Sequence, residues 1–190
     1  MKLPIRKIAN TIAFATLGML GMTSCNKLAN YLQYDLAMQT ATVNFTIPPC
    51  PNTNIAVAGS QTVYYNIDSF IKANTMNTMG IANITSAKVA SCQITLLDPT
   101  TANNFANFKS CTSSFYSDAD ATPYQMNISD NPDVYATSLT LPVDTSSELK
   151  GYLTNGRQFT YSLSGNLRRP TKDSIHCTAT ISFKVHVQGI

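Results

Sequence analysis

Residues 176–187 read HCTATISFKVHV, a stretch in which polar and apolar residues alternate without a break. Alternation with a period of two places successive side chains on opposite faces of a β-strand. The inward face of this strand would carry Cys177, Ala179, Ile181, Phe183, Val185 and Val187. A strand with six apolar positions on one face must pack against other strands, so this stretch predicts a β-sheet with a solvated outer face.

The same period of two recurs along the chain and predicts further strands. We expect them at 41–47, 61–67, 87–97, 110–117, 124–128, 136–141 and 158–163, in addition to 176–187. Turn-forming residues separate these segments, and Thr, Ser and Asn fill most of the outward positions. The pattern therefore predicts an all-β fold, an antiparallel immunoglobulin-like β-sandwich of about seven strands.

One short helix is expected near 145–154. Thr145-Ser-Ser-Glu148 has the form of a capping box, in which the Thr hydroxyl and the Glu carboxylate accept each other's backbone N–H groups. Leu149 and Leu153 would share a face, and Asn155-Gly156 would end the helix. Weaker signals predict a short helix after Asp68-Ser69 and some helical character within a tether at 26–40.

The first 25 residues, MKLPIRKIANTIAFATLGMLGMTSC, have the form of a secretory signal peptide. Lys2, Arg6 and Lys7 precede an apolar stretch that is too short to span a bilayer. The segment Met22-Thr23-Ser24-Cys25 resembles a bacterial lipobox, and on this resemblance we interpret the chain as a Gram-negative envelope lipoprotein. The resemblance implies cleavage before Cys25, acylation of Cys25 and hence a lipid anchor.

The interpreted cleavage divides the chain into a signal peptide at 1–24, a tether at 25–40 and a β-sandwich domain at 41–190. Asn26 stands where inner-membrane lipoproteins often carry Asp, which favours the outer membrane, facing either the periplasm or the surface. The formal charge of +3 equals the three basic residues of the signal peptide, so the remainder is formally neutral. We therefore expect a membrane anchor and a protein or glycan partner, and no nucleic acid.

Four cysteines remain after Cys25: Cys50, Cys92, Cys111 and Cys177. Export to an oxidising compartment would favour two disulfides. Three connectivities are open. Cys92 with Cys111 is the first choice because they would lie on consecutive strands, and Cys50 with Cys177 is its complement. No CxxC spacing supports a zinc site.

The sequence offers little that could carry catalysis. Its two histidines, His176 and His186, would lie on the same strand face about 33 Å apart at the rise of a β-strand, so they cannot share a site. Asp118 with Asp120, and Asp130 with Asp133, could serve as catalytic carboxylates or calcium ligands, but are expected to be turn residues. No nucleotide, metal or cofactor motif is present. We predict no enzyme activity, no cofactor and no metal.

Positive charge gathers in one part of the chain and defines a candidate anion or partner patch. Its members are Lys150, Arg157, Arg168, Arg169 and Lys172. The predicted function is that of a lipid-anchored envelope protein with a non-enzymatic binding or structural role. Two alternatives stay open. One is a glycan-binding accessory lipoprotein of an outer-membrane uptake system, in which one ring of Tyr64-Tyr65 or of Phe115-Tyr116 is exposed and stacks on sugar. The other is a carboxylate-dependent hydrolase.

Overall fold

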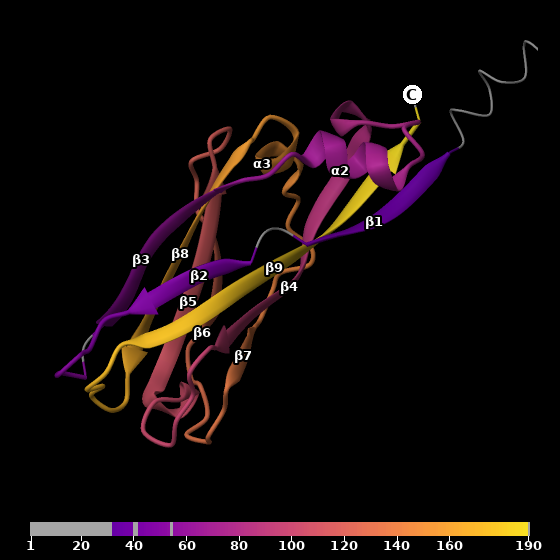
Figure 1. Cartoon of the computed structure of the whole chain (residues 1–190). Helices are drawn as coiled ribbons and strands as arrows, with labels where there is room; N and C mark the ends of the chain where they lie inside the picture. The colour runs from indigo at the N-terminus through magenta and orange to yellow at the C-terminus, as the bar shows by residue number, and fades with distance from the viewer. Residues whose placement is uncertain (1–31, 40–41, 54, 190) are drawn as a thin grey trace, which may run out of the picture.

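Two antiparallel sheets pack face to face in the computed structural model, which describes residues 32–39, 42–53 and 55–189, with backbone only at 55–57 (Figure 1). The first sheet contains β1 (Gln33–Gln39), β2 (Val43–Ile47), β4 (Ile84–Leu96), β7 (Ser138–Leu141) and β9 (Ile175–Gln188). The second sheet contains β3 (Ile55–Tyr64), β5 (Phe108–Ser117), β6 (Tyr124–Ile128) and β8 (Gln158–Leu167). The prediction of an antiparallel β-sandwich is confirmed.

The order of the strands corrects the predicted immunoglobulin-like topology. The first sheet has the order β1-β9-β4-β7, with β2 also paired to β9, and the second has the order β3-β8-β5-β6. From β2 onward every connection crosses between the sheets except the hairpin that joins β5 to β6. The last strand therefore lies between the first strands and β4, which is the arrangement of a double-sheet jelly roll. Period two identifies strands, but it carries no information on which sheet a strand joins.

The alternation that predicted β9 is confirmed, because its apolar side chains are buried and its polar ones face outward. Facing side chains from the second sheet complete the core. Phe115 of β5 is fully buried and meets the Phe183 ring edge-on, with ring centroids 5.3 Å apart. Three further rings surround Phe115, those of Tyr124, Tyr152 and Tyr161. Such clusters join the two sheets through both buried area and ring geometry.

Two short helices lie together at one end of the sandwich (Figure 1). Helix α2 (Ile67–Asn74) is longer than predicted and begins earlier, because the Asn66 side chain caps it by accepting the Ser69 N–H at 2.9 Å. Two 3-10 turns, η2 (Ile81–Asn83) and η3 (Phe105–Asn107), precede β4 and β5.

Helix α3 (Lys150–Thr154) confirms a short helix near 145–154, but the predicted capping box is wrong. The helix begins after Leu149, so Thr145 is not its capping residue and Glu148 does not bond back to Thr145. The Glu148 carboxylate instead accepts the Ala87 N–H at 2.7 Å, the Ser86 hydroxyl at 2.7 Å and the Lys150 N–H at 2.9 Å. Glu148 thereby joins α3 to β4, a long-range contact that a local motif cannot reveal.

The amino-terminal part of the chain also differs from expectation. Residues 33–39 form β1 against β9 instead of a helical tether. The interpreted signal peptide, with its lipobox and Cys25, lies outside the described residues. In the described part of the chain, no helix is both long enough and apolar enough to cross a bilayer.

Candidate functional site

The fold divides the five residues of the basic patch between the two ends of the sandwich. Arg157 immediately precedes β8, close to Lys150 of α3, whereas Arg168 immediately follows β8. Arg169 and Lys172 lie in the same connection as Arg168, between β8 and β9. A strand of ten residues spans about 33 Å, so the five charges do not form one patch.

Arg168 links two loops through hydrogen bonds from its side chain. Its guanidinium donates to the carbonyl oxygens of Ala106 at 2.9 Å and Asn131 at 2.6 Å, with a longer contact of 3.5 Å to that of Phe108. Its side chain is 24% exposed, so these bonds are partly shielded from water. The cation therefore satisfies backbone acceptors of two loops, and its donors are engaged within the protein.

Arg169 is likewise occupied by the protein. Its Nη2 donates to both oxygens of the Asp133 carboxylate, at 2.6 and 2.5 Å, and its Nη1 donates to the Ala106 carbonyl at 3.2 Å. Hydrogen bonding to Arg169 lowers the pKa of Asp133 below its usual value. A hollow of about 420 Å³ lies beside this pair and includes Tyr135 in its lining. The cation in this hollow, Arg169, is already neutralised by Asp133.

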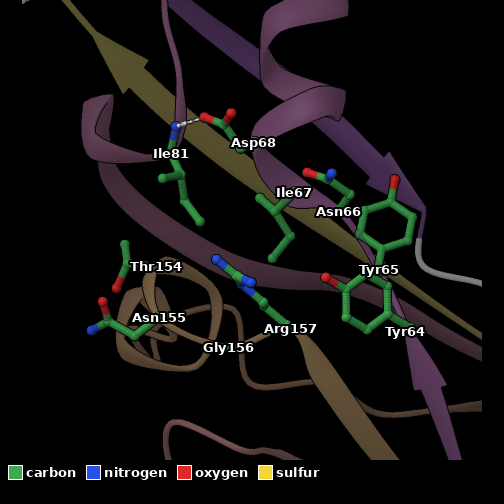
Figure 2. A pocket seen from close by; sticks show the side chains of 10 residues that line it. All are labelled: Tyr64, Tyr65, Asn66, Ile67, Asp68, Ile81, Thr154, Asn155, Gly156 and Arg157. Carbon is green, nitrogen blue, oxygen red and sulfur yellow. Dashed lines mark hydrogen bonds between the residues drawn. The ribbon is translucent and has the colours of Figure 1, made fainter.

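The opposite end of β8 contains a larger pocket, of about 580 Å³, between α2 and the turn that joins α3 to β8 (Figure 2). This volume lies within the range of small-molecule sites. Three connecting segments contribute the lining: Tyr64 to Asp68, Ile81, and Thr154 to Arg157. Figure 2 shows the Arg157 side chain in the middle of this group, between Thr154 and the two tyrosines.

The acidic residue of this pocket is already paired. The Asp68 carboxylate contacts the Lys72 ammonium at 2.6 Å and accepts the Ile81 N–H at 2.9 Å. The hydrogen bond to Lys72, followed by that from Ile81, lowers the pKa of Asp68. Asp68 therefore stays ionised with its charge balanced, and the pocket keeps the positive charge of Arg157.

The backbone around Arg157 is fixed while its side chain is not. The Arg157 N–H donates to the Asp118 carboxylate at 2.8 Å, and the Arg157 carbonyl accepts the Tyr65 N–H at 3.1 Å. The bonds from Arg157 and Gln158 N–H lower the pKa of Asp118. Among the described residues, the Arg157 guanidinium takes part in no ion pair and no hydrogen bond.

Aromatic and small residues complete the pocket. Tyr64 is 64% exposed, whereas Tyr65 packs against Phe70 and has its pKa raised by burial. Gly156 is required beside Arg157, because a Cβ at this position would overlap the Tyr152 carbonyl oxygen. Tyr64, Arg157 and the Asn155-Gly156 stop carry separate signals in the sequence. Asn66, Ile81 and Thr154 carry none, since only the crossover between sheets brings α2 beside α3.

The other candidate catalytic residues contact a neighbouring strand or their own turn. His176 contacts the Thr46 hydroxyl, and His186 contacts the Asp35 carboxylate at 2.8 Å. Asp120 accepts the Thr122 N–H within its own turn. Among the described residues, no group of three or more His, Cys, Asp or Glu side chains is placed to hold a metal ion.

The predicted disulfides are wrong, because all four described cysteines are free thiols. Cys92 lies on β4 of the first sheet and Cys111 on β5 of the second, so they face each other across the core. Burial raises the pKa of Cys92 to about 11 and those of Cys111 and Cys177 to about 12. Cys50 bonds through its backbone to Thr171.

Comparison with known proteins finds matches among solved structures. No family model and no curated protein matches the chain. Solved structures that match include the BFDV capsid protein as a 60-mer, with 8% identity over 84% of this chain and 95% of that one, at a TM-score of 0.37. The decameric BFDV capsid protein matches with 11% identity over 83% of this chain and 100% of that one, at a TM-score of 0.38. A structure of Desmodium yellow mottle tymovirus matches with 10% identity over 82% of this chain and 89% of that one, at a TM-score of 0.29.

These comparisons overturn the interpretation as a Gram-negative envelope lipoprotein. The three matching structures named above are viral, and two of them are capsid proteins. We therefore withdraw the lipid-anchored envelope role, the outer-membrane location, the membrane and glycan partners, and the two alternative functions. Because the identities and TM-scores are this low, the likeness gives this chain no function in their place.

Proposed function

We propose that this chain is a non-enzymatic binding protein and that its pocket between α2 and α3 takes a small molecule bearing an oxyanion. The observation that carries the proposal is the Arg157 guanidinium, which makes no hydrogen bond and no ion pair among the described residues and projects into a pocket of about 580 Å³. The Asp118 carboxylate acts on this guanidinium through charge alone. A guanidinium binds carboxylate or phosphate through two parallel N–H donors, so oxyanions are its natural ligands.

The rest of the pocket supports a ligand with an apolar or aromatic body. Tyr64 offers an exposed ring, and Ile67 and Ile81 contribute apolar side chains. Thr154 and Asn155 supply polar groups on the opposite side (Figure 2). Neither His nor Cys lines this pocket, and Asp68 is engaged by Lys72 and Ile81, so a free general base is absent from its lining.

Calorimetric titration with benzoate, and separately with inorganic phosphate, tests the proposal. We expect benzoate to bind more tightly than phosphate, because only benzoate contacts the tyrosine ring as well as the cation. Arg157→Gln should weaken binding at least tenfold, since a charged hydrogen-bonded contact contributes about 1.5–3 kcal/mol.

Lys172→Gln is the matched control, because it removes one exposed positive charge at the far end of the sandwich. It should leave both affinities unchanged. The proposal is wrong if neither probe binds the wild-type chain, or if the two variants reduce affinity equally.

A further inference from the structure

The charged groups around the oxyanion pocket differ in whether another charge balances them. Asp68 is balanced by Lys72, whose ammonium lies 2.6 Å from its carboxylate. Arg157 and Asp118 differ from this pair, because neither side chain takes part in an ion pair among the described residues. The pocket therefore has an uncompensated cation in its lining and an uncompensated anion just outside the lining.

The Asp118 carboxylate is held against the segment that carries Arg157. Its Oδ1 accepts the Arg157 N–H at 2.8 Å and the Gln158 N–H at 3.2 Å, and the Asp118 N–H donates to the Gln158 carbonyl at 3.1 Å. A Cβ at Gly156 would lie 2.9 Å from the Cβ of Ser117, so the two turns are in direct contact. The backbone bonds lower the pKa of Asp118 and the Arg157 charge lowers it further, which means that the two charges act on each other.

We propose that Asp118 determines the charge specificity of this pocket, so that the pocket prefers a singly charged oxyanion to a doubly charged one. The inference rests on the proposed function and names its ligand class. Carboxylates and sulfate esters belong to the favoured class, and phosphate monoesters to the disfavoured one.

The preference follows from how attraction and desolvation depend on ligand charge. The attraction of an anion to a site grows in proportion to its charge. The cost of taking the anion out of water grows with the square of its charge. Asp118 lowers the positive potential that Arg157 creates, so the attraction no longer offsets the larger desolvation cost of a dianion.

Asp118→Asn separates the charge of this residue from its hydrogen bonds. Both backbone N–H groups donate to Oδ1, and an Asn side chain offers the same acceptor oxygen without the charge. Asp173→Asn is the matched control, because it removes the same charge from an exposed position in the connection between β8 and β9, at the far end of the sandwich.

Calorimetric titration with phenyl sulfate and with phenyl phosphate tests the inference. The two probes share a ring and a tetrahedral head, but at about pH 8 only the phosphate ester carries nearly two charges, because its second pKa is about 6. Salt of about 0.01 M keeps the screening length near 30 Å. Wild type should bind phenyl sulfate more tightly than phenyl phosphate.

The variants should change the two affinities unequally. Asp118→Asn should tighten phenyl sulfate binding about threefold, as suits an exposed charge, and phenyl phosphate binding about tenfold, since a change in potential acts twice on a dianion. Asp173→Asn should change neither affinity. Thermal unfolding of each variant checks that the fold is retained.

A second readout uses the wild-type chain alone. Lowering the pH from about 8 to about 5 converts phenyl phosphate to a monoanion. Asp118 stays ionised over this range because its pKa is lowered. The affinity for phenyl phosphate should therefore rise toward that for phenyl sulfate, which serves as the internal reference.

Several outcomes would overturn this inference while leaving the pocket in place. They are a wild-type preference for phenyl phosphate at about pH 8, an unchanged ratio of affinities at about pH 5, equal tightening of both probes in Asp118→Asn, or the same gains in Asp173→Asn. If neither probe binds the wild-type chain, the proposed function itself fails.

Discussion

An arginine lies at each end of β8, and only one of the two has its side chain hydrogen-bonded within the protein. Arg157 precedes the strand and Arg168 follows it, ten residues of strand apart. Arg168 donates to the carbonyl oxygens of Ala106, Phe108 and Asn131, whereas the Arg157 guanidinium makes no such bond among the described residues. One arginine holds the sandwich together, and the other is available to a ligand.

The difference arises from the acceptors that each end supplies. Next to Arg168, the loops before β5 and after β6 leave the Ala106 and Asn131 carbonyls pointing at the guanidinium. Next to Arg157, the Asp118 carboxylate is taken by backbone N–H groups and that of Asp68 is taken by Lys72. An arginine is therefore structural where the fold leaves acceptors free beside it, and available to a ligand where those acceptors are already bonded. Its neighbours in the sequence do not decide which case applies.

Replacing each arginine in turn should give the largest difference between the two ends of β8. Arg168→Gln should lower the free energy of unfolding by about 3 kcal/mol, because it leaves shielded carbonyl oxygens without donors. Arg157→Gln should change it by no more than about 0.5 kcal/mol, as at ordinary surface positions. Urea unfolding measures both, and equal losses would contradict the assignment of roles.

Glu148 tests whether the pocket end depends on its own support. Glu148→Ala removes acceptors from Ala87 N–H, the Ser86 hydroxyl and Lys150 N–H, and should cost about 1–2 kcal/mol of stability. It should also weaken benzoate binding, because α3 leads directly into Thr154 to Arg157. Urea unfolding and calorimetry measure the two effects. Unchanged affinity at reduced stability would show that α3 does not position the pocket.

The smallest effect concerns acid stability at the Arg168 end. The hydrogen bonds from Arg169 lower the folded pKa of Asp133 below 3.8. This ion pair therefore stabilises the fold at pH values above 3.8, and the stabilisation is lost as pH falls through the lowered pKa. Asp133→Asn should melt slightly below wild type at neutral pH, and the gap should close in strong acid. A gap that is the same at every pH would contradict the ion pair.

The sequence predicted the strands much better than it predicted their arrangement. Alternation identified β9 and β5 with their inward cysteines, because a period of two reports which face of a strand is buried. It could not show that β4 and β5 lie in different sheets, and it did not show that Cys92 and Cys111 stay free thiols.

The candidate site was only partly predictable for a related reason. Arg157 and Arg168 look alike in the sequence, and proximity in the chain placed them in one patch. The carbonyls that bind Arg168 come from Ala106 and Asn131, some 62 and 37 residues away. Such long-range backbone acceptors leave no local signal. The Gly156 beside Arg157 was visible, but only as a helix stop.

We propose that Arg157, unlike Arg168 and Arg169, is open to an oxyanion. The most direct measurement follows the side-chain Nε–Hε resonances of Arg157, Arg168 and Arg169 by NMR while benzoate is added. We predict a saturating shift of the Arg157 signal, with those of Arg168 and Arg169 unchanged. Equal shifts of all three signals, or a shift confined to Arg168 and Arg169, would contradict this account.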